Sequence, residues 1–326
     1  MIENYQFSSV LPTFASCADR YVLGGYGRGG TTMDEMLDLA VKVKDLDGLE
    51  LVGGWHVNDQ NIKEVGKKLK DRGFKLSMLV PDLWTQAKWG RGSIAATDPK
   101  TRQASVDEVR KCMDWAAELD CPYVDVWGGQ DGYDYSFQAD YVEVWKWMRE
   151  SLHAMGEHSD KVKVLVEYKA REPRMRCFIT NAATVLLLLR GLDKIGVVLD
   201  VGHALAAGEN MAAAVALLAS HGKLDYFHFN DNYRSWDDDM IVASVHLVET
   251  LELMYWIKRV GYKGWLSLDM FPYREDKVQA AIQAREWMKA LLAAIDRVGM
   301  DKIDKVIKGN EGTEAVALVR EALTGR

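Results

Sequence analysis

Cysteine is scarce in this sequence, and long apolar runs are missing. The four cysteines among the 326 residues show no CxxC spacing, so we expect reduced thiols rather than a disulfide framework. No run approaches the roughly 20 apolar residues that a membrane-spanning helix needs. The first residues hold no basic region followed by an apolar core, which argues against a signal peptide. These absences predict a cytoplasmic protein that does not enter a membrane.

Clusters of positive charge are also missing. Lysine and arginine number 41 against 48 aspartates and glutamates, which gives a formal net charge of -7. This mild acidity argues against a nucleic-acid-binding surface, which needs clustered basic residues. The first predicted strand is not followed by a GxGxxG phosphate turn, so a doubly wound dinucleotide-binding fold is disfavoured.

Short runs of strand-forming residues alternate with helical segments along most of the chain. We expect strands over residues 4–10, 48–52, 75–80 and 122–127, and four more that end at Glu167, Asp200, His228 and Asp269. Helices are expected from Thr32 and over residues 60–72, 102–119, 139–156, 178–191, 210–221, 246–260 and 274–298.

This alternation indicates a parallel sheet, and eight units in roughly 300 residues indicate a closed (β/α)8 TIM barrel of the α/β class. We predict one catalytic barrel domain over residues 1–300. A short C-terminal helical extension is expected over residues 301–326.

Four of the predicted strands end in a side chain that can bind a metal. In a parallel barrel the carboxyl ends of the strands meet at one face, so Glu167, Asp200, His228 and Asp269 should converge there. Carboxylates with an imidazole suit Mn²⁺, with Co²⁺, Mg²⁺ or Zn²⁺ as alternatives. Taken singly, each of the four could equally be a cap or turn residue.

Two further groups lie near these strand ends. His203, Asp237 and Asp239 could hold a second cation or contact substrate, and the alternative is a solvated acidic loop. Lys169 shares a strand face with Glu167 because alternate residues point the same way. It could donate to a substrate oxygen, or form a salt bridge with Glu167 or Glu172.

His56 and Asp59 follow the second predicted strand and form a candidate acid–base pair, although a loop histidine bonded to backbone is the alternative. Aromatic and cationic residues occupy the loops at the expected active face. We predict substrate contacts from four of them: Arg20, Tyr26, Trp55 and Trp127. Packing between helices and barrel is the other interpretation of the aromatic residues.

Several motifs together resemble the metal-site motifs of the xylose isomerase-like barrels, and most closely those of L-rhamnose isomerase. They are Glu167-Tyr-Lys169, Asp200-Val-Gly-His203, His228-Phe-Asn-Asp231, Asp237-Asp-Asp239, Asp269, His56-x-x-Asp59 and Asp19-Arg-Tyr21. The resemblance implies an aldose–ketose isomerase that acts at a sugar carbonyl and the adjacent carbon. It assigns Glu167, Asp200, His228 and Asp269 to a structural metal, with Lys169 polarising the carbonyl. His203, Asp237 and Asp239 would bind the second, catalytic metal, and His56 would contact the sugar.

The resemblance leaves other chemistries open. Catalytic α subunits of C-glycoside deglycosidases are similar barrels that cleave a C–C bond in 3-oxo-glycosides together with a small β-sandwich partner. Ketose 3-epimerases use one metal and two glutamates; Glu167 matches one of these, but Asp269 stands in place of the other. A non-enzymatic scaffold would need neither Lys169 nor His56. We expect a homo-oligomer or a hetero-oligomer with a small partner, and a sugar or glycoside as ligand.

Overall fold

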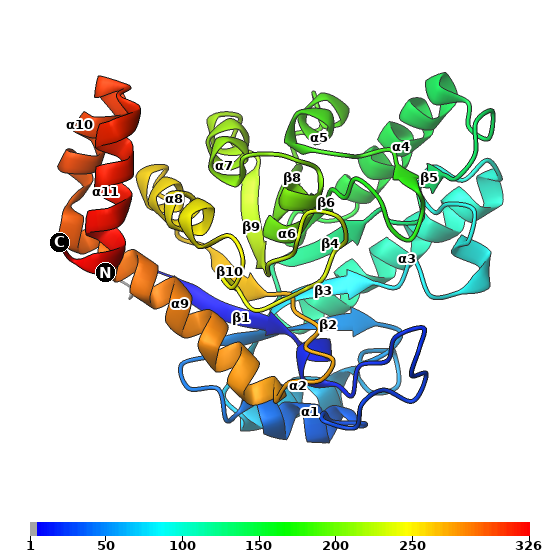
Figure 1. The fold of residues 1–326 in the computed structure, drawn as a ribbon. Coiled ribbons are helices and arrows are strands. Elements are labelled where there is room, and N and C mark those ends of the chain that lie inside the picture. Colours follow the sequence, from blue (N-terminus) through cyan, green and yellow to red (C-terminus); the bar gives the residue numbers. More distant parts are fainter. Residues whose placement is uncertain (1–4) are drawn as a thin grey trace.

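The computed structural model describes residues 5–326, and its eight long strands close into a parallel barrel in the order β1-β10-β9-β8-β6-β4-β3-β2 (Figure 1). The predicted (β/α)8 barrel is therefore confirmed. Residue 4 of the first predicted strand lies outside the described residues. The barrel strands are β1 (Gln6–Val10), β2 (Gly48–Gly53), β3 (Lys75–Pro81), β4 (Tyr123–Trp127), β6 (Lys163–Glu167), β8 (Ile195–Asp200), β9 (Leu224–Phe229) and β10 (Trp265–Leu268).

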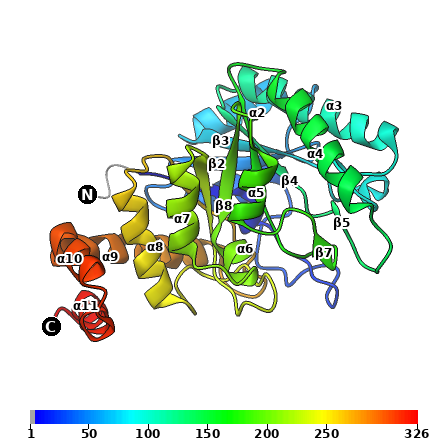
Figure 2. The same ribbon diagram turned by 90° about the horizontal axis from the view of Figure 1, so that it is seen from above.

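Helices surround the barrel and cover the outward faces of its strands (Figures 1 and 2). Side chains from the strands themselves fill the interior of the barrel. The strands are thus buried on both faces, which explains why their sequences are largely apolar. A capping box between Thr32 and Glu35 begins the first helix as the sequence predicts. The helices are α1 (Met33–Ala40), α2 (Ile62–Asp71), α3 (Pro99–Glu118), α4 (Tyr141–Gly156), α5 (Ala182–Leu188), α7 (Met211–Ser220), α8 (Leu247–Arg259) and α9 (Lys277–Val298).

Short elements at the carboxyl face of the barrel were not predicted. They are η2 (Leu11–Phe14), η3 (Ala87–Trp89), α6 (Val201–Ala206), and the antiparallel pair β5 (Gly132–Tyr133) and β7 (Arg176–Cys177). The β5–β7 pair ties the loop after β4 to the loop after β6. Elements of two to six residues are too short to show a hydrophobic period. The helix predicted over 178–191 is shorter in the structure, where α5 covers Ala182–Leu188.

Two helices follow α9, namely α10 (Met300–Gly309) and α11 (Gly312–Thr324). They pack on the end of α9 beside α8, at the side of the barrel (Figure 2). The break between α9 and α10 falls at Gly299, whose φ of 90° suits glycine. Within residues 5–326 no helix is long and apolar enough to cross a membrane.

Candidate metal centre and substrate cavity

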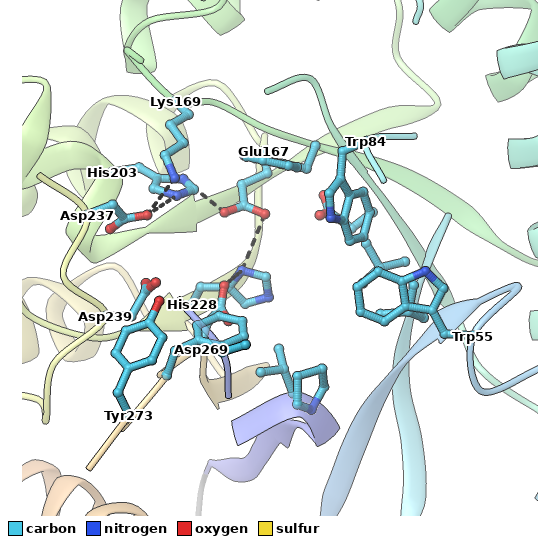
Figure 3. Close-up of a pocket in the computed structure, with 18 residues that line it drawn as sticks. Trp55, Trp84, Glu167, Lys169, His203, His228, Asp237, Asp239, Asp269 and Tyr273 are labelled. Atoms are coloured by element: carbon cyan, nitrogen blue, oxygen red, sulfur yellow. Dashed lines mark hydrogen bonds and ion pairs between the residues drawn. The ribbon is translucent and has the colours of Figure 1, made fainter. Parts of the chain in front are cut away.

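A cavity of about 380 Å³ lies at the carboxyl ends of the barrel strands. Its wall combines carboxylates, two histidines and a lysine with several aromatic side chains (Figure 3). Figure 3 shows the acidic and histidine side chains on one side of the cavity, and Trp55 and Trp84 on the other. The cavity therefore has a polar side and an aromatic side.

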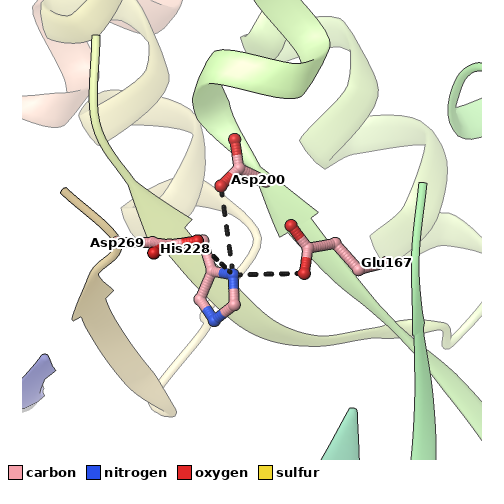
Figure 4. Close-up of side chains that lie close together, drawn as sticks. All are labelled: Glu167, Asp200, His228 and Asp269. Atoms are coloured by element: carbon pink, nitrogen blue, oxygen red, sulfur yellow. Dashed lines mark ion pairs between the residues drawn. The ribbon is translucent and has the colours of Figure 1, made fainter. Parts of the chain in front are cut away.

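The four predicted strand-end residues converge on one point (Figure 4). One ligand atom from each of Glu167, Asp200, His228 and Asp269 lies within 4.8 Å of the others. His228 Nδ1 is 3.4 Å from Glu167 Oε2, 3.9 Å from Asp200 Oδ2 and 3.6 Å from Asp269 Oδ2. We refer to these four residues as the first group.

The donor atoms of the first group fit a divalent cation. His228 Nδ1 is buried and has no hydrogen-bond partner within the described chain, although three carboxylates surround it. Burial raises the pKa of Asp269 to about 8, a shift that His228 opposes and Asp200 reinforces. Crowded carboxylates of this kind are stabilised in their ionised form when a cation is bound, so binding would release protons.

Glu50 holds His228 from the opposite side, and sequence reasoning missed it. The His228 Nε2–H group donates to Glu50 Oε2 at 3.0 Å, and Tyr226 and Ser267 donate to Glu50 Oε1. With its proton fixed on Nε2, His228 presents the Nδ1 lone pair to the three carboxylates. A carboxylate behind a histidine commonly orients that histidine toward a metal.

We expect Glu50→Leu to weaken Mn²⁺ binding by about 10- to 100-fold, because the His228 ring loses the acceptor that fixes its orientation. Glu50→Gln keeps an acceptor and should weaken binding less. Calorimetric titration of metal-free protein measures both effects. Ser8→Ala serves as control because the Ser8 hydroxyl contacts Tyr226 rather than Glu50. Unchanged Mn²⁺ affinity in both Glu50 variants would show that Glu50 has no part in metal binding.

A second group of possible ligands adjoins the first and shares Asp200 with it. It consists of Asp200, His203 and Asp237, whose ligand atoms also lie within 4.8 Å of one another. His203 Nε2 is 3.0 Å from Asp237 Oδ2. The predicted set differs in one member, because Asp239 lines the cavity without joining this group. Asp200 is the third member of the group instead. It caps the N-terminus of α6 and accepts the backbone N–H of His203, which brings His203 beside it.

Lys169 extends into the same cavity and contacts the second group. Its Nζ atom is 2.7 Å from Asp237 Oδ2 and 3.5 Å from Glu172 Oε2. It also lies 5.3 Å from the centroid of the Trp127 ring. Burial would lower the pKa of Lys169, but the nearby carboxylates of Asp237 and Asp239 raise it above its usual value. Lys169 is therefore a permanent cation and hydrogen-bond donor at the cavity wall.

The structure does not bring together His56 and Asp59, the predicted acid–base pair. His56 Nδ1 accepts the backbone N–H of Val52 at 3.0 Å, whereas Asp59 bonds Lys111 and Trp115 of α3. Neither residue is part of the cavity wall. After β2 the chain turns at Gly54, whose φ is 83°, and this turn folds His56 back against the strand.

The burial of His56 predicts that the stability of the protein depends on pH. Burial lowers the pKa of His56 to about 4, below its ordinary 6.5. The stability due to its neutral form is complete above pH 6.5 and is lost as the pH falls toward 4. We expect this loss to reach about 2 kcal/mol between pH 8 and pH 5. Urea unfolding at both pH values should show it in the wild type and not in His56→Asn. Equal losses in the two proteins would assign the pH dependence to other groups.

Three tryptophans form the aromatic side of the cavity. The ring centroids of Trp55 and Trp84 are 5.6 Å apart, and those of Trp84 and Trp127 are 5.5 Å apart. Asp82 accepts the indole N–H of Trp55 at 3.0 Å and so fixes its ring. Trp55 and Trp127 thus lie where the sequence analysis expects substrate contacts.

The other two predicted substrate contacts lie outside the cavity wall. Arg20 is exposed and bonds the hydroxyl of its neighbour Tyr21, while the Tyr26 hydroxyl bonds Asp19 and accepts from Arg274. These bonds hold Arg20 beside its neighbour in the chain and tie Tyr26 to the segment that follows β10. Phe271 and Tyr273, which the sequence analysis did not single out, line the cavity instead.

Asp125 also lines this cavity. Burial, and then the negative charge of the nearby Glu167, raise the pKa of Asp125 well above its usual range. A side-chain hydrogen bond between Asp125 and Glu167 contributes to the same shift. No residue in the described part of the chain other than Glu167 pairs with the Asp125 oxygens.

Comparison with known proteins relates the chain to sugar-converting enzymes. It is 27% identical over 259 residues to "Xylose isomerase" of Thermus thermophilus, covering 77% of this chain and 67% of that protein. It is 28% identical over 217 residues to "Xylose isomerase" of Paraburkholderia phytofirmans, covering 63% of this chain but 49% of the longer relative.

Solved structures share the fold at lower identity. A D-tagatose 3-epimerase-like protein superposes with a TM-score of 0.68 at 17% identity, covering 89% of this chain and 98% of its own. An L-ribulose 3-epimerase superposes with a TM-score of 0.69 at 15% identity, covering 90% and 96%. The family model described as "Xylose isomerase-like TIM barrel" matches residues 37–291. The chain therefore belongs to the xylose isomerase-like TIM barrel family.

Proposed function

We propose that this protein is a sugar isomerase that depends on a divalent metal and interconverts an aldose and a ketose. The observation that carries the proposal is the pair of adjacent ligand groups that share Asp200, with the Lys169 ammonium beside them in one cavity. The curated relatives named xylose isomerase support it. Mn²⁺ is the favoured cation, with Co²⁺, Mg²⁺ or Zn²⁺ as alternatives.

Different residues of the cavity would bind the cations, polarise the sugar carbonyl and pack against the sugar. Glu167, Asp200, His228 and Asp269 would hold one cation, and Asp200, His203 and Asp237 a second one. Bound cations polarise sugar oxygens and stabilise negative charge that develops on them. Lys169 donates a hydrogen bond to the carbonyl oxygen, while Asp237 keeps the ammonium in place. The tryptophans cover the apolar faces of the sugar and exclude water.

The test combines turnover with metal counting. Metal-free protein is titrated with Mn²⁺ by calorimetry and then incubated with D-xylose and L-rhamnose, with ketose formation as the assay. We expect two binding events and ketose production. The double variant Asp237→Asn/Asp239→Asn should show one event and no ketose. A single event in the wild type without ketose formation would contradict the isomerase proposal.

A second candidate is cleavage of the C–C bond in a 3-oxo-C-glycoside. The row of Trp55, Trp84 and Trp127 favours it, because three adjacent indoles offer more flat apolar surface than one pyranose ring covers. Release of the aromatic aglycone from such a glycoside, with one Mn²⁺ bound, would support this lyase. Conversion of D-allulose to D-fructose would instead indicate a 3-epimerase.

A further inference from the structure

Asp125 is a buried carboxyl group that the protein leaves only partly paired. It lies in the middle of β4 and is 1% exposed. Its side chain pairs with that of Glu167, and one such bond leaves the second Asp125 oxygen without a partner among residues 5–326 although the side chain forms part of the cavity wall. An unsatisfied buried polar group of this kind costs about 1–3 kcal/mol, so its presence requires an explanation.

Two other buried carboxyl groups, which lie outside the cavity, have both oxygens paired. Asp131 accepts from the backbone of Ser93, Ile94 and Ala95 and from the Ser93 hydroxyl. Asp231 accepts from the backbone of Val245 and from the ring and backbone of His246. Where a buried carboxyl stabilises loops in this fold, its oxygens are thus occupied. Asp125 differs because it belongs to the cavity wall and not to a loop.

The cavity wall near Asp125 includes apolar side chains that cannot hydrogen-bond its carboxyl group. Two valines, Val52 of β2 and Val80 of β3, line the same part of the cavity. Trp127 follows two residues later on the same face of β4, and its indole N–H is also buried without a partner in the described chain. β4 therefore places two polar groups at the cavity wall, the Asp125 carboxyl and the Trp127 indole N–H.

Asp125 does not belong to either ligand group. In the barrel register Trp127 pairs with Glu167, whereas Asp125 pairs with Leu165. Asp125 thus lies one strand repeat deeper in the barrel than Glu167 of the first group. A ligand that places two oxygens at the cations would extend another part of itself to this depth.

We propose that Asp125 is a substrate-binding residue whose carboxyl group hydrogen-bonds a hydroxyl of the bound sugar, away from the carbons that react. This inference rests on the proposed function, because it takes a sugar as the ligand. It makes Asp125 a determinant of specificity. A substrate with a methyl or hydrogen at that carbon leaves the buried carboxyl unpaired, and sites of this kind strongly reject such analogues.

The experiment measures sugar binding separately from metal binding. Mn²⁺-loaded wild type, Asp125→Val and Asp125→Asn are titrated with D-xylose and with its monodeoxy analogues. Valine matches the neighbouring Val52 and Val80, and asparagine keeps a hydrogen-bonding group in case the valine variant fails to fold. Tyr123→Phe is the control, because Tyr123 precedes Asp125 on the same strand face and is not part of the cavity wall.

We expect Asp125→Val to bind Mn²⁺ like the wild type and to bind D-xylose about 10-fold more weakly, as the loss of one hydrogen bond to a neutral carboxyl group implies. Asp125→Asn should lose less. For one deoxy analogue, the wild type and Asp125→Val should bind equally, since the partner hydroxyl is already gone.

Three results would overturn the inference: equal D-xylose affinity in wild type and Asp125→Val, reduced Mn²⁺ affinity in that variant, or the same affinity ratio for every deoxy analogue. Failure of the proposed function looks different. Wild type that binds Mn²⁺ but neither D-xylose nor L-rhamnose nor D-allulose contradicts the sugar assignment itself, and the inference falls with it.

Discussion

Replacing Lys169 with methionine should lower kcat by about 10²-fold or more while the fold and the metal content stay unchanged. Methionine has a similar length but no charge and no hydrogen-bond donor. The loss of one donor aimed at a developing negative charge typically costs about 10²- to 10³-fold in rate. Lys169 is not a member of either ligand group, so the cations should remain bound.

The control for this variant is Lys163→Met, at the start of β6, the strand that precedes Lys169. Lys163 forms an ion pair of similar length, at 2.6 Å to Asp225, but is not part of the cavity wall. Its replacement should leave kcat close to the wild-type value. Elemental analysis of both variants separates metal loss from loss of the donor. Near-normal turnover in Lys169→Met would reduce Lys169 to a salt-bridge partner of Asp237.

The barrel and the first group could be predicted because both depend on regular features of the sequence. Strands buried on both faces produce continuous apolar runs, and the end of such a run locates the carboxyl face of the barrel. Glu167, Asp200, His228 and Asp269 each stand at or next to that end. Their convergence then follows from closure of the barrel, without knowledge of loop structure.

Glu50 and Asp125 could not be found in the same way. Both are polar residues inside strands, at positions 50 and 125 of β2 and β4, where the sequence shows an isolated charge in an apolar run. Alternation predicts that they face inward. Whether a partner such as His228 lies across the barrel depends on the register between distant strands, which sequence spacing does not contain.

The pairing of His56 with Asp59 failed for a related reason. A spacing of three residues brings two side chains together on a helix, but these residues lie in a turn that follows Gly54. The positive φ at this glycine reverses the chain. The partners of Arg20 and Tyr26 were unpredictable as well, because both residues lie in an irregular segment and Tyr26 also accepts a hydrogen bond from the distant Arg274.

Glu167→Gln should weaken Mn²⁺ binding by about 10²-fold or more, the largest effect that we expect on metal affinity. Loss of a residue that merely orients a ligand costs about 10- to 100-fold, and Glu167 is itself a member of the first group. It also stands between the two histidines, since Oε1 lies 2.9 Å from His203 Nδ1 and Oε2 lies 3.4 Å from His228 Nδ1. Glutamine keeps the shape of the side chain but places a neutral amide between them.

The matched control is Glu172→Gln, which removes one carboxylate near Lys169 without altering either ligand group. Calorimetric titration with Mn²⁺ should show nearly wild-type affinity for this variant and a large loss for Glu167→Gln. Because the groups adjoin through Asp200, loss of the first cation should weaken binding at Asp200, His203 and Asp237 too. Equal Mn²⁺ affinity in Glu167→Gln and Glu172→Gln would mean that the convergence of four strand ends is not a metal site.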